Sequence, residues 1–396
     1  MSSDLLIIGG GAAGITAAIE SKLLKPSLKV MILEKKEMIG KKLKATGNGR
    51  CNLTHTDLPT AASTIRFFER LGIPVREDGT GRVYPFSESA PGVVKTLEQV
   101  LKALGVTILC DTAVTKLKVK QDGLTVCAGK QRFDSKAVLI TTGGKAGPVY
   151  GCTGDGYELA KALGHQVTKT LPVLTGICCE GDFSRLKGTR AKGKLELDCY
   201  ESCVFSENGE IQFTEYGISG ICAFNLSRYL CYQGDAKLAP YRIKIDLAPG
   251  RSFEALFKGW QDHKLLSGST IRQLLTGMMK APLAELVVQC ANLSGDGLWR
   301  NLTPKEIEDL EGTLHEIILK PTGTMGFKMA QCTSGGIVNE EIDEETLMSK
   351  LVPGLFFAGE IMDYDGPCGG FNLDHAFTTG RRAGKMASKW IEETEI

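Results

Sequence analysis

The chain has 396 residues, of which 42% are hydrophobic and 23% charged, enough to bury a sizeable core in two or more domains. Its formal net charge is +1, so no global field draws it to nucleic acid or to an anionic membrane. No apolar run reaches membrane-spanning length and no leader precedes the first apolar stretch, which predicts a cytoplasmic protein. The 13 cysteines contain no C-x-x-C pair and therefore indicate reduced thiols.

The N-terminal segment contains a fingerprint for binding a dinucleotide. The sequence DLLIIGGGAAGITAAIE predicts a buried strand over 4–8, a glycine turn and a helix. In the pattern G-x-G-x-x-G, the first glycine permits the tight turn, the second lets a pyrophosphate approach, and the third lets the helix pack on the strand. A second strand, KVMILE, ends in an acid that suits an adenosine ribose and repels a 2′-phosphate. The candidate residues are Gly9, Gly11, Ala12, Ala13, Gly14, Glu34 and Lys35.

The next segment, GKKLKATGNGRCNLTH over 40–55, is rich in cations, glycines and asparagines. We expect it to run along the pyrophosphate towards the reactive ring of the cofactor. Its cations offer charge to phosphates or to an anionic substrate, its glycines allow close approach, and its asparagines can bond ring carbonyls and nitrogens. Cys51 either faces the ring or packs in the core. The cofactor-binding candidates are Lys42, Gly47, Asn48, Gly49, Arg50 and Asn52.

Residues 106–142 predict a β-meander. Short alternating strands AVTKLKVK, LTVCA and QRFD are broken by Asp122-Gly123 and Ala128-Gly129. A separate buried strand, AVLITTGG, then returns to the first sheet. Downstream, Asp155 either caps a helix or contacts the cofactor. The candidates of this region are Val114, Thr142, Gly143 and Asp155.

An insertion is expected to divide the cofactor-binding domain into residues 1–165 and 325–396. Residues 166–250 are rich in predicted strands, with a hairpin turn predicted at Asn208-Gly209, and together with 313–324 they predict a β-barrel. Residues 251–312 have helical spacing and predict a helical subdomain. Within it, TPKE at 303–306 combines a helix cap, a proline and a reciprocal glutamate.

Near the C-terminus, LFFAGE has the form of a buried strand that ends at glycine, and GGFNLDHAFTTGRRAG opens a helix. A glycine–acid pair at a strand end suits a ribityl hydroxyl. A helix N-terminus suits the N1/O2 edge of a reduced flavin, where negative charge develops. NAD has no such edge, so the two ends of the chain together favour FAD. The candidates are Gly359, Glu360, Asp365, Gly369, Gly370, Phe371 and Asn372.

The predicted fold is α/β, a Rossmann-like FAD-binding domain with a three-layer parallel sheet and a β-meander, plus an inserted β-barrel and helical subdomain. Further motifs are TEYGISGICAFNLSRY, GTMGFKMAQCTSGGI and LFFAGEIMDYDGPCGG. With GKKLKATGNGRCNLT they make the chain resemble, along essentially its whole length, the BaiN/RdsA family of NAD(P)/FAD-dependent oxidoreductases, relatives of glutathione-reductase-type flavoproteins. This resemblance implies FAD binding and a two-electron reaction. Similar proteins are associated with bile-acid double-bond reduction, uridine reduction in ribosomal RNA and amine oxidation.

The expected function is reduction of a conjugated C=C bond in a small molecule, with NADH or NADPH as a transient electron donor and hydride transfer from flavin N5. Ribosomal RNA dihydrouridine synthesis is the alternative, left open by basic stretches such as RLKGTRAKGK, and amine oxidation is a further one. Reduction also needs a proton donor, and the candidates are Cys51, Tyr364 and Cys368. The 5 histidines are scattered and predict no metal site.

Overall fold

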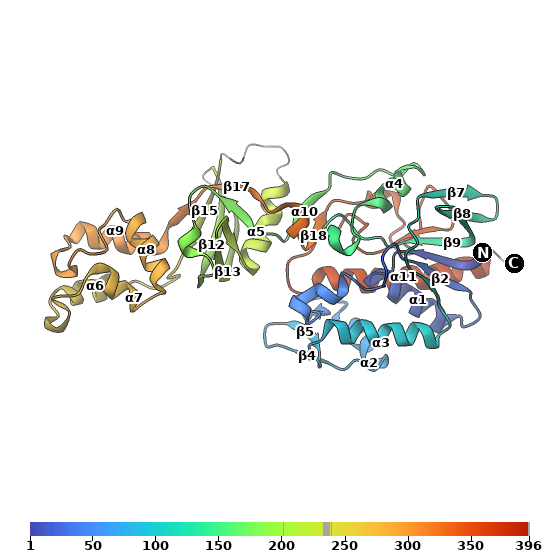
Figure 1. Ribbon diagram of the computed structural model, residues 1–396, viewed down its shortest axis with the longest axis horizontal. Helices are drawn as coiled ribbons and strands as arrows, with labels where there is room; N and C mark the ends of the chain where they lie inside the picture. The colour runs from blue at the N-terminus through green and yellow to red at the C-terminus, as the bar shows by residue number, and fades with distance from the viewer. Residues whose placement is uncertain (201, 233–237, 239, 395–396) are drawn as a thin grey trace. The chain divides into compact units, whose positions relative to one another are not determined.

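The computed structural model describes residues 1–200, 202–232, 238 and 240–394 of the chain (Figure 1). The chain forms two compact units, one made of Met1–Val173 and Phe327–Ile396 and the other of Leu174–Gly326. Among the described residues, no helix is both long enough and apolar enough to span a bilayer. Cysteines whose side chains are described are free thiols.

The first unit contains a seven-stranded sheet. Its strands are β1 (Ser2–Ile8), β2 (Val30–Leu33), β6 (Thr107–Leu109), β7 (Lys116–Lys120), β8 (Gly123–Ala128), β9 (Gln131–Ile140) and β19 (Leu355–Phe357). The order is β6-β2-β1-β9-β8-β7, and β19 also pairs with β9. The pairs that involve β1, β2, β6 and β19 are parallel, which confirms the predicted Rossmann-like sheet. The parallel strands read as continuous apolar runs because both faces of the sheet are covered.

The meander differs from the sequence prediction at its last strand. QRFD and AVLI, predicted as separate strands, form the single strand β9. Residues 131–135 of β9 pair antiparallel with β8, and residues 134–140 pair parallel with β1. No glycine or proline lies between the two halves, so the chain has no local reason to turn. One strand therefore joins the meander to the parallel sheet.

Two helices cross closely on this sheet, α1 (Ala12–Leu24) and α11 (Phe371–Glu393). A Cβ atom at Gly380 would lie 2.3 Å from the carbonyl oxygen of Ala13, and one at Gly384 would lie 2.3 Å from that of Ala17. Only glycine permits this approach. The crossing holds the C-terminal helix against the helix of the N-terminal fingerprint.

The rest of the first unit surrounds the two helices. A three-stranded sheet has the order β3-β5-β4, and a two-stranded sheet pairs β10 with β18. These strands are β3 (Thr54–His55), β4 (Val75–Glu77), β5 (Arg82–Pro85), β10 (Leu171–Val173) and β18 (Cys332–Ser334). The helices are α2 (Ala61–Arg70), α3 (Ala90–Ala103), α4 (Asp155–Lys161), and the short η1 (Leu43–Gly49), η2 (Pro148–Tyr150) and η6 (Asn339–Glu341). Helix α10 (Gly326–Met329) begins at the last residue of the second unit.

The second unit contains an antiparallel seven-stranded sheet. In order across the sheet, the strands are β16 (Ile317–Leu319), β15 (Tyr241–Asp246), β12 (Arg190–Cys199), β13 (Ser202–Thr214), β14 (Gly217–Ser219), β11 (Ile177–Cys179) and β17 (Pro321–Thr324). Its two edge strands, β16 and β17, are separated in the chain by Lys320 alone. The sheet must therefore curl like a barrel to bring its edges together.

The hairpin predicted at Asn208-Gly209 is wrong. These residues lie inside the long strand β13, where Asn208 pairs with Lys194 and Gly209 with Gly193 of β12. Helix α5 (Ile221–Tyr232) packs on this part of β13, and a Cβ atom at Gly209 would lie 2.6 Å from Cys222 Sγ. Glycine at 209 instead leaves room for the Cys222 side chain, as glycine inside a strand can where another element approaches closely.

Helices fill the remainder of the second unit. They are α6 (Glu254–Gln261), α7 (Ile271–Thr276), α8 (Ala281–Cys290), α9 (Pro304–His315), and the short η3 (Ser184–Leu186), η4 (Lys264–Leu266) and η5 (Trp299–Asn301). The predicted cap is confirmed: Glu306 N donates to Thr303 Oγ1 over 3.2 Å, and Thr303 N donates to Glu306 Oε2 over 2.8 Å. Strands and helices of this unit share one apolar core, in which Trp299 is fully buried.

Candidate functional site

The N-terminus of α1 has the form of an open anion site. Gly9 turns the chain at φ +107°, and a Cβ atom at Gly14 would lie 2.1 Å from the Gly9 carbonyl oxygen, so both glycines are sterically required. Gly11 is the N-cap of α1, and no side chain caps it. A Cβ atom at Gly11 would have no described atom within 4 Å. The first N–H groups of α1 are therefore free to hold a phosphate.

Glu34 follows β2 beside this turn. Its carboxylate accepts hydrogen bonds from Gly10 N over 2.8 Å and from Lys36 N over 2.8 Å. These two bonds hold the acid at the carboxyl edge of the sheet, where a ribose would meet it. The neighbouring candidate Lys35 turns to the candidate Asp155, with 2.5 Å between Nζ and Oδ2. Asp155 is the first residue of α4 and does not cap it, since the N-cap is Gly154.

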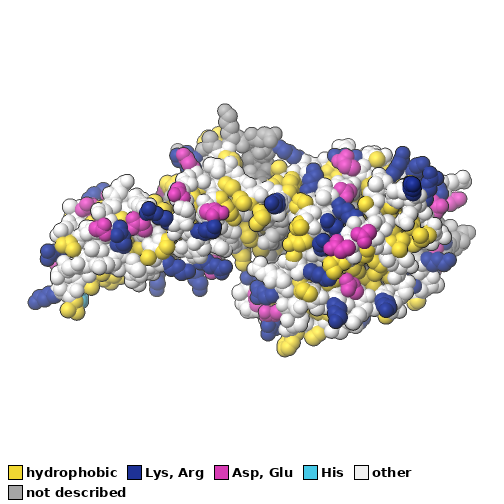
Figure 2. All heavy atoms as spheres, in the orientation of Figure 1, with side chains coloured by type: hydrophobic (Ala, Val, Ile, Leu, Met, Phe, Trp, Pro, Cys, Tyr) yellow, Lys and Arg dark blue, Asp and Glu magenta, His cyan; other side chains and the backbone are white. Residues whose placement is uncertain are grey.

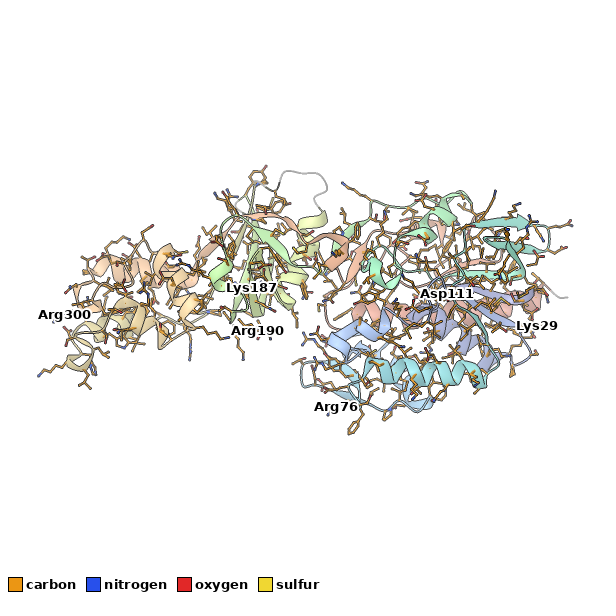
Figure 3. All side chains as sticks on the ribbon, in the orientation of Figure 1. Lys29, Arg76, Asp111, Lys187, Arg190 and Arg300 are labelled. Atoms are coloured by element: carbon orange, nitrogen blue, oxygen red, sulfur yellow. The ribbon has the colours of Figure 1, made fainter. Side chains whose placement is uncertain are left out.

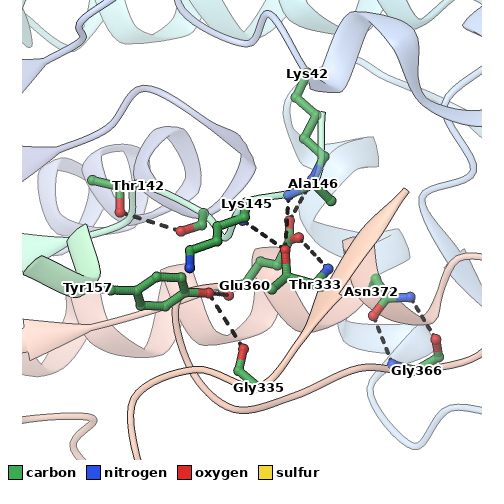
Figure 4. A network of polar contacts seen from close by, with 11 residues as sticks. Lys42, Thr142, Lys145, Ala146, Tyr157, Thr333, Gly335, Glu360, Gly366 and Asn372 are labelled. Atoms are coloured by element: carbon green, nitrogen blue, oxygen red, sulfur yellow. Dashed lines mark hydrogen bonds and ion pairs between the residues drawn. The ribbon is translucent and has the colours of Figure 1, made fainter. Parts of the chain in front are cut away.

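Glu360 and Lys42 form the centre of a polar network (Figure 4). Lys42 Nζ lies 2.7 Å from Glu360 Oε2, and Thr333 N donates to Glu360 Oε1 over 2.9 Å. Burial opposes the charged form of Lys42, yet Glu360 raises the pKa of the ammonium above its usual range. A Cβ atom at Gly359 would lie 2.9 Å from Ala13 Cβ, so the Gly359–Glu360 turn lies against the first turn of α1.

Asn52 presents a buried acceptor at the start of α11. Its Oδ1 atom is buried and has no hydrogen-bond donor among the described residues. A Cβ atom at Gly370 would lie 2.9 Å from this oxygen, and Gly369 and Gly370 have φ values of +135° and +105°. A buried amide oxygen without a donor is costly. It fits a ligand that carries an N–H group, such as the pyrimidine ring of a flavin.

Two further candidates at the start of α11 serve the turn before it. The Asn372 side chain accepts from Gly366 N over 2.8 Å and donates to Gly366 O over 2.9 Å (Figure 4). The Phe371 ring stacks on His55, with 4.9 Å between centroids. Asp365 and Cys368 are half-buried in the same turn. Asn372 thus holds the turn that carries a proton-donor candidate.

The three proton-donor candidates lie in different environments. The Tyr364 ring stacks on His375 with 3.9 Å between centroids and a 12° angle between the ring planes. Cys368 is half-buried. Cys51 is completely buried, and this burial raises its pKa to about 12.

The remaining candidates are spread around this centre. Gly143 lies near the network, because its Cβ atom would be 3.4 Å from Cys152 Sγ and 4.0 Å from Glu360 Oε2. Thr142 packs on Gly156 of α4, and the half-buried Val114 packs against the apolar core. The candidates of η1 lie at the surface: Gly47, Asn48 and Arg50 are exposed and Gly49 is half-buried.

Sequence reasoning missed several groups around Glu360. Thr333 N donates to its carboxylate, and Thr333 Oγ1 accepts from Lys145 N over 2.8 Å and Ala146 N over 3.0 Å. Tyr157 Oη lies 3.4 Å from the Glu360 carbonyl oxygen. Thr333 lies within the family motif GTMGFKMAQCTSGGI. The motif therefore marked the segment as functional, but it did not indicate which of its residues contacts Glu360. Over the described part of the chain, no group of histidines, cysteines and acids could hold a metal ion.

Comparison with known proteins identifies the family. The description "HI0933-like protein Rossmann domain" matches residues 3–63 and 59–386. The chain belongs to the HI0933-like Rossmann family. It is 33% identical to a 3-dehydro-bile acid delta(4,6)-reductase of Clostridium scindens, over 97% of this chain and 98% of that protein. It is 25% identical to a ribosomal RNA dihydrouridine synthase of Haemophilus influenzae, over 95% of this chain and 96% of that protein. The resemblance stated from the motifs is thereby confirmed.

Solved structures agree on the fold. A 3-ketosteroid-delta4-(5alpha)-dehydrogenase from Rhodococcus jostii RHA1 matches with a TM-score of 0.51 and 16% identity, covering 98% of this chain and 97% of that one. A flavocytochrome c3 fumarate reductase matches with a TM-score of 0.50 and 19% identity, covering 98% of this chain and 78% of that one. At these identities the likeness concerns the fold alone.

Proposed function

We propose that this member of the HI0933-like family is an FAD-dependent oxidoreductase that reduces a C=C bond conjugated to a carbonyl group in a small molecule. NADH or NADPH would donate the electrons. The most similar of the curated relatives described above is a bile-acid reductase, aligned over nearly the whole of both chains. The observation that carries the proposal is the set of binding groups around α1 and α11.

These groups fit FAD from end to end. Glu34 would hold the adenosine ribose, and the uncapped start of α1 at Gly11 would hold the pyrophosphate. Glu360, paired with Lys42, would accept hydrogen bonds from the ribityl chain. Asn52 Oδ1, a buried acceptor without a donor among the described residues, would receive a ring N–H. FAD bound there supplies the exchange of two electrons between donor and substrate.

The chain itself must supply or relay the proton that completes reduction of a double bond. Tyr364 is held by its stacking on His375. Cys368 lies in the turn that Asn372 stabilises with two hydrogen bonds to Gly366. Cys51 is the weaker candidate because it is sealed in the core. A general acid has to lie within hydrogen-bond reach of the substrate carbon, which a half-exposed side chain allows more readily than a buried one.

Cofactor content and the two half-reactions test this proposal. Purified protein should be yellow and should release FAD, not FMN, on denaturation. Under anaerobic conditions NADH or NADPH should bleach the flavin, and a 3-oxo-4,6-diene steroid acid should restore the colour. Release of FMN would contradict the cofactor assignment. Absence of bleaching by both nucleotides would mean that another reductant is used.

Reduction of uridine in ribosomal RNA is the second candidate, because relatives with that activity match nearly the whole chain. The charges of the basic stretch 185–194 do not favour it. Lys187 and Arg190, labelled in Figure 3, lie 2.6 Å from Glu215 and 3.2 Å from Glu210. On the face seen in Figure 2, acids lie among the cations over much of both units, and Lys and Arg side chains also gather along the lower edge of the second unit. Paired cations attract phosphates weakly.

A further inference from the structure

Two arginines near the flavin site lack a carboxylate partner. Arg50 follows η1, and its guanidinium lies 4.5 Å from the centroid of the Tyr84 ring. Arg82 begins β5 and donates from Nη1 to Thr80 Oγ1 over 3.1 Å. Neither guanidinium forms an ion pair with a described residue. Other arginines of this unit, such as Arg76 and Arg381, are paired with glutamates.

Arg82 lies beside the segment that opens α11, and Arg50 lies over Tyr84, two residues along β5 from Arg82. A Cβ atom at Gly369 would lie 3.6 Å from Arg82 Nε and 3.6 Å from the His55 ring. Arg50 Nη2 lies 3.4 Å from Tyr84 Oη. Arg82 and Tyr84 lie two residues apart on β5, so their side chains share one face of that strand. Burial raises the pKa of the Tyr84 hydroxyl, whereas the charges of Arg50 and Arg82 act to lower it.

Asp78 lies close enough to Arg82 for the arginine charge to lower the pKa of its carboxyl, but its hydrogen bonds go to other groups. Asp78 accepts hydrogen bonds from Thr80 N over 2.9 Å and from the Arg82 backbone N–H, and does not reach the Arg82 guanidinium within ion-pair distance. The phosphates of FAD are also provided for elsewhere, by the open N-terminus of α1. Two cations beside the ring-binding segment thus have no assigned anion.

We propose that Arg50 and Arg82 form a subsite that binds a carboxylate or phosphate group carried by one of the two reactants. This inference rests on the proposed function and names the chemistry of its substrate. Arg50 is exposed and Arg82 half-exposed, so an incoming anion can reach both. A planar guanidinium binds either anion through paired hydrogen bonds, and the start of α11 adds a favourable dipole.

The test compares Arg50→Met and Arg82→Met with a matched control, Arg76→Met. Arg76 lies on β4 in the same small sheet, is labelled in Figure 3, and is paired with Glu88. Its loss removes the same charge from the same region, and its guanidinium lies over the Phe86 ring and on Glu88 instead of on Tyr84. FAD content, measured by absorbance, should match the parent in all three variants. If Arg50→Met and Arg82→Met lose FAD, the arginines serve the cofactor and the inference fails.

Two arms separate the sources of the anion. The first measures KM and calorimetric binding for a 3-oxo-4,6-diene steroid carboxylic acid and for its methyl ester. The second measures anaerobic flavin reduction against NADH and NADPH concentration. If the anion is a substrate carboxylate, both variants should bind the steroid acid about tenfold or more weakly than the parent does, while their binding of the methyl ester should be unchanged. If the anion is a phosphate of the electron donor, the same loss of affinity should appear for NADH or NADPH and not for the steroid.

The inference is overturned if Arg50→Met and Arg82→Met behave like Arg76→Met towards the steroid acid, its ester, NADH and NADPH. The same holds if neither steroid binds and the two variants use the nucleotides as Arg76→Met does. A parental protein without FAD, or one whose flavin is reduced but never reoxidised by an enone, would instead refute the proposed function. Calorimetric binding of the acid does not need turnover, so it decides the subsite in that case too.

Discussion

At the scale of single residues, environment separates side chains that share the same chemistry. Cys51 and Cys368 are both thiols near the start of α11. Cys51 is buried, and desolvation raises its pKa to about 12, so it stays a neutral thiol that packs in the core. Cys368 lies half-exposed in a turn. The position in the fold thus decides which thiol can meet a substrate.

Substitution of the proton donor should separate the two half-reactions. We expect Tyr364→Phe or Cys368→Ala to leave FAD bound and reducible, and to slow reoxidation by substrate by about 10²-fold or more. Cys51→Ala should have less effect on this step, because its thiol is buried and its raised pKa makes it a poor proton donor. Stopped-flow absorbance measures both steps. If all three variants reoxidise at the parental rate, the proton comes from solvent or from a side chain outside this set.

His375 should make the protein sensitive to acid. Burial lowers the pKa of its imidazole to about 4, although a hydrogen bond to the Gly359 backbone acts in the opposite direction. Its unfolded pKa is about 6.5. The unfolded chain therefore binds the proton first, and stability falls as the pH drops below about 6.5. The loss from this residue is about 2 kcal/mol at pH 5.

Urea unfolding of the parent and of His375→Phe at pH 7.5 and pH 5 measures this loss. The variant keeps a ring beside Tyr364 and should lose less stability than the parent between the two pH values. His263→Phe is the control, since His263 is exposed in the second unit. An equal fall in the parent and His375→Phe would show that His375 is not held neutral in the folded state.

At the scale of elements, two glycines at the start of α1 have different roles, one in cofactor binding and the other in folding. Gly11 has φ −84°, and a Cβ atom there would meet no protein atom within 4 Å, whereas one at Gly14 would lie 2.1 Å from the Gly9 carbonyl oxygen. We expect Gly11→Val to fold normally and be colourless, because its side chain fills the pyrophosphate site. Gly14→Val should be destabilised by several kcal/mol, about 3 or more. Thermal unfolding and flavin absorbance measure the two effects. A yellow Gly11→Val protein would contradict the site.

At the scale of the whole molecule, charge balance bears on the choice between substrates. The net charge is +1, and acids face the cations of the barrel-like sheet. We expect binding to ribosomal RNA fragments to be no tighter than binding to random RNA, with a salt slope that corresponds to about 3 phosphate contacts or fewer. Filter binding across a salt series measures both quantities. Tight, salt-dependent preference for ribosomal RNA would favour the uridine-reducing alternative.

The sequence by itself determined the features that depend on neighbouring residues. The strand–glycine turn–helix of the fingerprint, the acid that ends β2 and the capping box of α9 are each contained in a short segment, so spacing and residue type suffice. The family motifs determined the fold class because they extend along the whole chain.

Only the tertiary structure decided what distant segments do together. Glu360 meets Lys42 and Thr333, and Arg82 meets Gly369, because α11 packs along α1 and brings the C-terminal turn beside the N-terminal segments. Tertiary pairing also overturned the hairpin at Asn208-Gly209, because β12 pairs with these residues and α5 packs beside Gly209. A local pattern records the preference of a residue for a turn, but it does not contain the identity of the side chain that will lie against it from elsewhere in the chain.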